Sequence, residues 1–123
     1  MVLVVEDYSD AREMMCLLLA VLGYDALPAE DGAQAVALAR QEQPDLILLD
    51  LNLPIMDGFQ AAALIRRQPE TQGVPIIACT ALNKVEWRRH ALTAGCNDFI
   101  CKPLNFDELE QLLHRYAPLA GAA

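Results

Sequence analysis

Long apolar runs, basic side chains and paired cysteine motifs are all scarce in this 123-residue sequence. No apolar run approaches the roughly 18 residues of a membrane-spanning helix, and no basic segment followed by an apolar one marks a secretion signal. The chain carries 9 basic against 17 acidic side chains, a formal net charge of -8 that repels nucleic-acid phosphates and anionic lipid surfaces. We therefore expect a cytoplasmic protein that binds neither nucleic acid nor membranes directly.

The four cysteines form no C-x-x-C pair and have no histidines at metal-ligand spacing beside them. Each lies in or beside an apolar run, which is typical of small buried side chains in a reducing compartment. Cys96 and Cys101 leave a redox role open as the minor alternative. The length suits one core that needs no disulfides, so we expect one domain over residues 1–116 and a tail or linker stub over residues 117–123.

Short apolar runs alternate with amphipathic stretches, which is the pattern of βα units around a parallel sheet. Unbroken apolar runs at 2–5, 46–49 and 76–79 predict central strands that helices cover on both faces. Shorter, more polar runs at 25–28 and 98–101 predict strands at or near the edges. The helices expected between and after these strands span residues 10–22, 32–41, from 57 or 58 to before 69, 84–94 and 106–116.

Capping residues mark the ends of these helices. Ser9, Asp31 and Asn105 are the expected N-caps, and Gly23 and Gly95 are expected to end the first and fourth helices. Right-handed crossovers and short connections between five βα units favour an α/β, doubly wound (βα)5 fold. The prediction is a flavodoxin-like three-layer sandwich with a parallel sheet of order 2-1-3-4-5.

Carboxylates follow two of the central strands at one edge of this sheet. Glu6 and Asp7 come after the first strand, and Asp50 comes after the third. In the order 2-1-3-4-5 the winding direction reverses between these strands, and ligands bind at such a point. Three converging carboxylates repel one another unless a cation lies among them, and oxygen ligands without His or Cys favour Mg2+. The sequence therefore predicts a Mg2+ site here.

Two further functional groups follow strands at the same edge. Thr80 ends the fourth strand, and Lys102 follows the fifth. A carboxylate that attacks phosphorus mainly needs neutralisation of charge on the transferring oxygens, which Mg2+ and the Lys102 ammonium provide. The Thr80 hydroxyl and the backbone N–H of Ala81 are expected to hydrogen-bond the attached phosphoryl group. The pattern predicts an acyl phosphate on Asp50.

Four motifs, in this order and at these intervals, resemble the response-regulator receiver domain (CheY-like) of two-component signalling. The motifs are VVED at 4–7, DLNLPIMDG at 50–58, TA at 80–81 and GCNDFICKPL at 95–104. The resemblance covers about residues 2–116. It implies that Asp50 accepts a phosphoryl group from a histidine kinase or a histidine-phosphotransfer protein, with Mg2+ as cofactor. A member of this family is a known example of the 2-1-3-4-5 order, so the resemblance and the expected topology are not independent.

The resemblance also assigns roles around the metal. Asp7 binds Mg2+ directly, Asn52 lends its backbone carbonyl, and Glu6, which replaces the more frequent Asp, acts chiefly through a bound water. Lys102-Pro103 resembles the cis peptide of the family. Phe99 stands at the mobile aromatic position, often a Tyr, so the switch relies on packing without a hydroxyl.

Switching and partners follow from the same resemblance. Phosphorylation draws Thr80 inward and Phe99 follows, which reshapes the surface of the fourth helix, fifth strand and fifth helix for an output partner. The first helix, with Met14 and Met15, is where the family docks its histidine-phosphotransfer donor. The output partner or attached output domain is not assigned, and a phosphorylation-linked dimer is compatible with this interpretation.

The expected protein assists its own phosphorylation and dephosphorylation without turning over an independent substrate. Two alternatives to this interpretation remain open. A Mg2+-dependent aspartyl phosphatase also uses an Asp nucleophile at a strand end, but its second acid would fall on Asn52, and the chain has no room for a cap domain. A phosphorylation-independent scaffold on the same fold is the other alternative, against which the retention of all the acidic residues, Thr80 and Lys102 argues.

Overall fold

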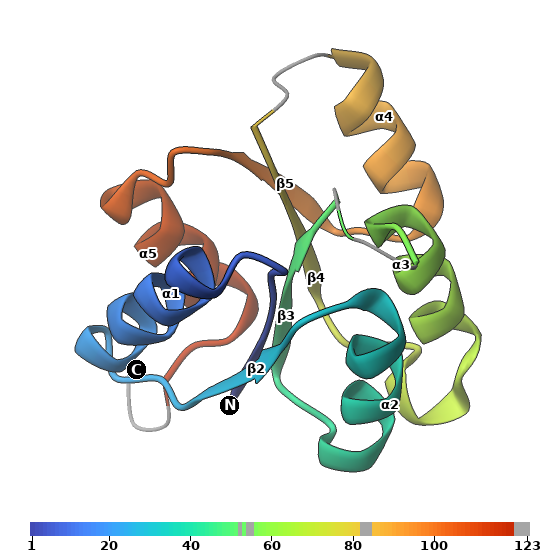
Figure 1. Cartoon of the computed structure of the whole chain (residues 1–123), viewed down its shortest axis with the longest axis horizontal. Helices are drawn as coiled ribbons and strands as arrows, with labels where there is room; N and C mark the ends of the chain where they lie inside the picture. Colours follow the sequence, from blue (N-terminus) through green and yellow to red (C-terminus); the bar gives the residue numbers. More distant parts are fainter. Residues whose placement is uncertain (52, 54–55, 82–84, 120–123) are drawn as a thin grey trace.

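Five parallel strands form one sheet in the order β2-β1-β3-β4-β5 in the computed structural model of the chain (Figure 1). The structure describes residues 1–51, 53, 56–81 and 85–119. The order confirms the predicted doubly wound α/β fold. The elements are β1 (Val2–Val5), α1 (Ser9–Val21), β2 (Ala26–Ala29), α2 (Gly32–Glu42), β3 (Leu46–Asp50), α3 (Gly58–Arg67), the 3-10 helix η1 (Pro69–Thr71), β4 (Ile76–Thr80), α4 (Val85–Ala94), β5 (Asp98–Cys101) and α5 (Phe106–Tyr116).

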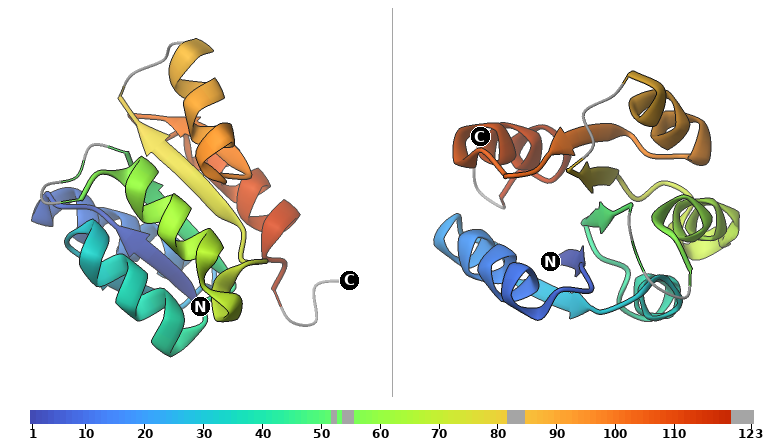
Figure 2. Two further views of the ribbon diagram at one scale, coloured as in Figure 1. Left: turned by 90° about the vertical axis from the view of Figure 1, so that its right-hand side faces the viewer. Right: turned by 45° about the horizontal axis from the view of Figure 1, so that its top comes forward.

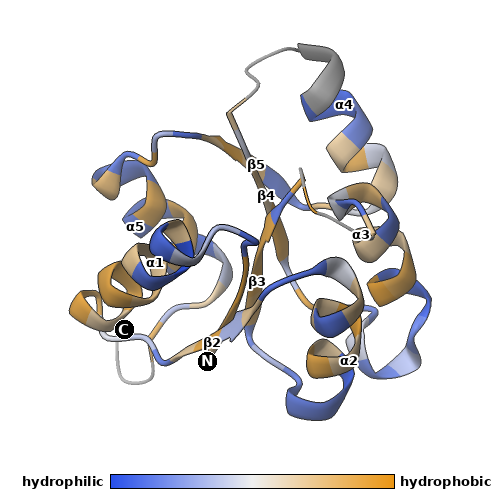
Figure 3. Cartoon of the chain, in the orientation of Figure 1, coloured by the Kyte–Doolittle hydropathy of each residue, from blue (hydrophilic) through white to orange (hydrophobic). Residues whose placement is uncertain are grey.

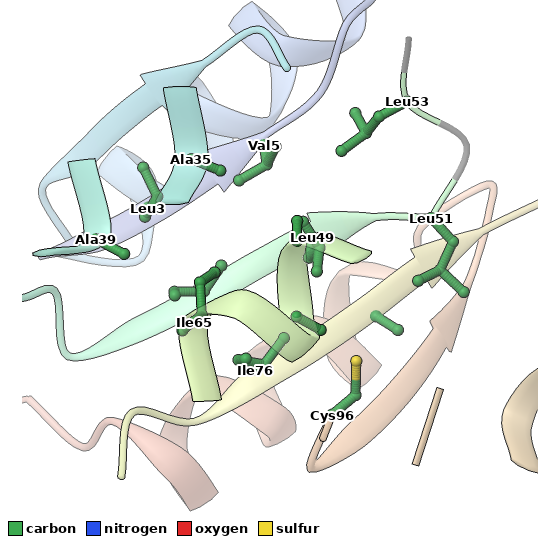
Figure 4. Packing of buried hydrophobic residues seen from close by; sticks show 14 of the residues in the cluster. Leu3, Val5, Ala35, Ala39, Leu49, Leu51, Leu53, Ile65, Ile76 and Cys96 are labelled. Atoms are coloured by element: carbon green, nitrogen blue, oxygen red, sulfur yellow. The ribbon is translucent and has the colours of Figure 1, made fainter. Parts of the chain in front are cut away.

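The sheet lies between two layers of helices, α1 and α5 on one face and α2, α3 and α4 on the other (Figure 2). Successive strand residues point to opposite faces, so the apolar strands supply both cores. Figure 4 shows Ala35 and Ile65, from α2 and α3, packed in the same buried cluster as Leu3 and Leu49 of the strands. The second core, under α1 and α5, contains Val4. Figure 3 shows the resulting pattern, with apolar strands between helices whose residues alternate in hydropathy.

Side-chain caps start three of the helices. Asp31 accepts a hydrogen bond from Gln34 N (2.8 Å) at α2, as predicted. Asn105 likewise caps α5 through Glu108 N (3.0 Å), and Asp57 caps α3 through Gln60 N (2.8 Å). The predicted glycine stops also hold, because φ is +93° at Gly23 and +113° at Gly95, values that favour glycine.

The cap predicted for the first helix was wrong. Ser9 is the first helical residue of α1, and the N-cap position falls on Tyr8, which makes no side-chain cap hydrogen bond. The extended backbone of β1 continues to Glu6, whose N–H bonds to Ala29 O (3.1 Å), and only a short turn separates it from the helix. The helix therefore starts one residue earlier than predicted, at Ser9 itself.

Strand ends also differ from the prediction by single residues. β3 continues one residue past its predicted apolar run, to Asp50, whereas β4 ends at Thr80, as predicted; both polar residues remain paired with the neighbouring strands. β2 begins one residue later than predicted, at Ala26, and η1 was not predicted. Lys84, the predicted first residue of the fourth helix, lies outside the described residues.

The C-terminal end of the described chain packs back onto the fold. Ala117 is buried, and its carbonyl accepts a hydrogen bond from the Tyr24 hydroxyl at 2.7 Å. Leu119 packs against the core under α1 and α5, close to Gly23. In the described ranges no helix combines the length and the apolar character that crossing a membrane requires.

Candidate functional site

The register of the sheet brings the acidic residues together at its carboxyl edge. Val5 of β1 is paired with Leu49 of β3, so the residues that follow them, Glu6 and Asp50, are neighbours. On the other side of β3, Asp50 is paired with Cys79 of β4. The backbone of β3 stays anchored past this point, because Leu51 N donates to Cys79 O at 3.1 Å. Asp50 is therefore held by paired strands on both sides.

The predicted acidic residues converge on one point. Glu6, Asp7 and Asp50 each offer a carboxylate oxygen, and these three atoms all lie within 4.8 Å of one another. Glu6 and Asp50 are only 4% and 6% exposed, whereas Asp7 is exposed to solvent. Glu6 Oε2 is buried and has no hydrogen-bond partner among the residues that the structure describes. A hard divalent cation fits this oxygen-only donor set and would give that atom a partner, either directly or through a bound water.

The Lys102 ammonium closes the other side of the cluster. Its Nζ donates to Glu6 Oε1 at 2.7 Å and to Asp50 Oδ2 at 3.0 Å. The backbone N–H of Lys102 bonds to Thr80 O at 2.7 Å, which ties the segment after β5 to the end of β4. The Lys102-Pro103 peptide is cis, as the resemblance implies. One ammonium thus contacts two of the three carboxylates.

Burial and crowding change the ionisation of this cluster. Burial raises the pKa of Glu6 from 4.5 to about 7, the adjacent Asp50 carboxyl adds to the rise, and Lys102 opposes it. Burial also acts to lower the pKa of Lys102, but its hydrogen bonds to Glu6 and Asp50 outweigh this effect and raise the pKa. The ammonium stays charged, and it does not fully compensate the carboxylates around it.

The remaining predicted residues lie around this centre. Thr80 is buried at the end of β4, and Ala81 follows it at the surface. Phe99 of β5 is 5% exposed, and the Arg88 guanidinium from α4 lies 5.7 Å from the centre of its ring. The predicted carbonyl ligand on Asn52 lies outside the described residues.

Gly58, the first residue of α3, was missed as a site residue. A Cβ at this position would lie 2.5 Å from Asp50 O and 2.6 Å from Leu51 Cα, closer than real Cβ contacts allow. Only glycine lets α3 begin directly against the end of β3. The Asp57-Gly58 pair was interpreted as a helix start and as the end of the motif at 50–58, and neither interpretation shows which backbone atoms lie opposite Gly58.

Arg12 of α1 was also missed. Its Nη1 donates to Glu6 O at 2.9 Å and to Asp7 O at 3.3 Å, so it hydrogen-bonds the backbone carbonyls of both acidic residues. No sequence signal identifies this contact, because the partners are backbone carbonyls and not side chains.

Comparison with known proteins identifies the family of this arrangement. The model of the response regulator receiver domain matches residues 2–114. The phosphate regulon transcriptional regulatory protein PhoB of Klebsiella pneumoniae is 37% identical over 123 residues, which cover 97% of this chain and 54% of that protein. The chain spans about half the length of this and other curated transcriptional regulators that it matches.

Solved structures share the same fold. The receiver domain of sensor histidine kinase PA1611 from Pseudomonas aeruginosa PAO1, with a magnesium ion in its active site cleft, has a TM-score of 0.87 and 39% identity over 94% of each chain. The receiver domain of Ssk1 from Saccharomyces cerevisiae, crystallised with the histidine phosphotransfer protein Ypd1, has a TM-score of 0.89 and 30% identity over 99% of this chain and 90% of that one. The chain therefore belongs to the response regulator receiver domain family, as its motifs predicted.

Proposed function

We propose that this chain is a phospho-accepting signalling switch in which Asp50 receives a phosphoryl group from a histidine kinase or a histidine-phosphotransfer protein. The observation that carries this proposal is the convergence of the Glu6, Asp7 and Asp50 carboxylates, with Lys102 bonded to two of them. Such a site suits transfer of an anionic group, because that chemistry mainly needs alignment and charge neutralisation. The likeness to receiver domains supports the same role.

The transfer itself is a displacement at phosphorus. An Asp50 carboxylate oxygen forms a bond to phosphorus while the nitrogen–phosphorus bond of a phosphohistidine breaks, and the donor imidazole keeps the electron pair and takes up a proton. The carboxylates of Glu6, Asp7 and Asp50 and the backbone carbonyl of Asn52 are the proposed metal-site groups. When bound there, Mg2+ supplies positive charge to the transferring oxygens. Lys102 offers its ammonium to the same oxygens from the opposite side.

Residues at the end of β4 and in β5 are proposed to report the phosphorylated state. The Thr80 hydroxyl and the Ala81 N–H bond the phosphoryl group, and Phe99 moves with Thr80. Phe99 is already largely buried under α4, so the change is a repacking of this aromatic ring and Arg88 over it. The surface of α4, β5 and α5 would then differ between the two states and control an output partner or a phosphorylation-linked dimer.

The donor is proposed to dock against α1. A groove of about 410 Å³ runs beside the acidic cluster and is lined by Met14, Met15, Leu18 and Leu104 together with Lys102. Met14 is 58% exposed, and Leu17 and Val21 of the same helix are 64% and 77% exposed, so α1 presents several large apolar side chains to solvent. The co-crystal of the Ssk1 receiver domain with Ypd1 supports a histidine-phosphotransfer protein as this partner. A cytoplasmic location and a domain boundary near residue 116 belong to the same proposal.

The direct test is the mass of the intact protein after incubation with acetyl phosphate and Mg2+. The wild-type chain should gain one phosphoryl group that hydroxylamine or alkali removes, as expected of an acyl phosphate, and Asp50→Asn should gain none. Asp25→Asn is the matched control, because it removes an exposed carboxylate that precedes β2, at the opposite end of the strands from Asp50. An unmodified wild-type protein would refute the proposal. Catalytic turnover of a small phosphate ester would favour the phosphatase alternative, and partner binding that ignores phosphorylation would favour the scaffold.

A further inference from the structure

Arg12 folds back from the first turn of α1 over the segment that joins β1 to this helix. Its backbone N–H bonds to Tyr8 O at 2.9 Å, as the helix requires. Its side chain is only 16% exposed and reaches the Glu6 and Asp7 carbonyls through Nη1. Nη2 lies 3.6 Å from a carboxylate oxygen of Glu30, which follows β2. The guanidinium therefore connects the acidic segment to two elements beside it.

The two carbonyls that Arg12 holds belong to the peptide units on either side of the Asp7 α-carbon. Fixing both planes restricts φ and ψ of Asp7, and with them the direction in which its carboxylate leaves the backbone. Asp7 needs such support, because it is the exposed member of the cluster and lies in a turn whose N-cap residue, Tyr8, makes no side-chain cap. Groups behind a metal ligand commonly set its orientation in this way.

We propose that Arg12 is a positioning residue for the metal site, which holds the Asp7 carboxylate where it converges with Glu6 and Asp50. This inference rests on the proposed Mg2+-dependent function. Arg12 is not itself a catalytic residue, since it contacts the backbone of the acidic pair and not its carboxylates.

The direction in which Mg2+ affinity changes when Arg12 is removed separates a positioning role from a purely electrostatic one. The guanidinium is a positive charge next to a cation site, so its removal should strengthen Mg2+ binding if only Coulomb repulsion acts. Glu30 compensates part of that charge and makes the electrostatic effect small. If Arg12 positions Asp7, its removal should instead weaken Mg2+ binding. The Asp7 carboxylate is then mobile before the metal binds, and binding must offset the conformational entropy that it loses.

The experiment measures Mg2+ affinity by isothermal titration calorimetry for wild type, Arg12→Met and Arg40→Met. Arg40 is the matched control, because it is an arginine on α2 with its own ion-pair partner, Glu70, at 3.7 Å. We expect Arg12→Met to raise the Kd for Mg2+ about tenfold, within the range known for groups behind metal ligands, and Arg40→Met to change it less than about twofold. The Mg2+ dependence of phosphorylation by acetyl phosphate gives a second readout. Arg40→Met should reach its half-maximal rate at the wild-type Mg2+ concentration, whereas Arg12→Met should need a concentration several-fold higher.

An Arg12→Met protein that binds Mg2+ as tightly as Arg40→Met, or more tightly, would overturn the inference. If Arg12→Met does not fold, as judged by its thermal transition without divalent ions, Arg12→Lys takes its place. This variant keeps the charge but not the planar fork, so it should still weaken Mg2+ binding at least about threefold; unchanged affinity would again overturn the inference. Absence of Mg2+ binding in the wild-type chain would instead refute the proposed function, and the inference with it.

Discussion

The cost of burying Glu6 can be measured by replacing it with Gln and following stability against pH in the absence of divalent ions. The folded-state pKa of Glu6, about 7, lies above its ordinary value of 4.5, so the folded protein holds a proton that the unfolded chain releases. Stability from this group is therefore complete below about pH 4.5 and is lost as the pH rises through 7. Glu6→Gln imitates the protonated side chain at every pH and should lose this dependence.

The size of this change in stability follows from the pKa shift of Glu6. Raising its pKa from 4.5 to about 7 corresponds to about 3 kcal/mol in the free energy of unfolding, at about 1.4 kcal/mol per pKa unit. Most of this is lost between about pH 5 and about pH 8, so the difference in the free energy of unfolding between Glu6→Gln and wild type should grow by about 2 to 3 kcal/mol in favour of the variant. Urea unfolding followed by circular dichroism, with EDTA present, measures both proteins across this range.

Mg2+ provides the internal control for this prediction. Because the metal requires ionised carboxylates, its stabilisation of the wild-type chain should be larger near pH 8 than near pH 6, reaching about 2.7 kcal/mol at about one hundred times its Kd. The Glu6→Gln protein should show a weaker dependence on Mg2+. Parallel pH profiles for wild type and variant in EDTA would refute the reasoning, because they would show that ionising this buried carboxyl costs nothing.

Three further substitutions test contacts that stabilise the fold, the first of them beside the site. Gly58→Ala places a Cβ against the backbone of Asp50 and Leu51 and should destabilise the protein by about 1 to 3 kcal/mol in urea unfolding. Gly73→Ala, with no described atom within 4 Å of its Cβ, should change stability by less than about 1 kcal/mol. Arg66 donates to four backbone carbonyls and one side-chain amide oxygen, so Arg66→Met should cost about 2 to 4 kcal/mol in the same assay, and a loss below about 1 kcal/mol would contradict this structural role. Tyr24→Phe leaves the buried carbonyl of Ala117 without its donor and should lower the thermal midpoint by an amount equivalent to about 1 to 2 kcal/mol; an unchanged midpoint would show that the C-terminal segment is not held there.

The fold was predictable from the sequence because buried strands and their helices leave different patterns. Apolar runs such as 2–5 are unbroken only where both faces of a strand are covered, and the structure places them at the centre of the sheet. The errors concern boundaries. Asp50 and Thr80 are polar, so the apolar pattern stops before them, although the backbone pairing continues. Hydropathy reports which side chains are buried, and it does not report where hydrogen bonding between strands ends.

The candidate site was predictable for a related reason. In a parallel sheet all carboxyl ends lie at one edge, so acidic residues that follow strands in the sequence become neighbours in space. Glu6 and Asp50, which are 44 positions apart, meet in this way. The supporting contacts were not predictable, because Arg12 and Gly58 act on backbone atoms. A carbonyl group is present at every residue. No pattern of residue types therefore predicts which carbonyl will accept a hydrogen bond from a guanidinium or lie too close to another residue to leave room for a Cβ.

The charges of the cluster explain how the proposed transfer to Asp50 would act as a switch. With all three carboxylates ionised, one ammonium leaves two negative charges uncompensated, which a divalent cation would neutralise. Phosphorylation then replaces the single charge of Asp50 with roughly -1.5 to -2 on the phosphoryl group, so the balance is negative again. Water has limited access to a group buried this deeply, and the excess must be met by donors of the protein. Thr80 ends the neighbouring strand, β4, and Ala81 follows it. We infer that the added negative charge draws this segment toward Asp50 and carries the signal to β5.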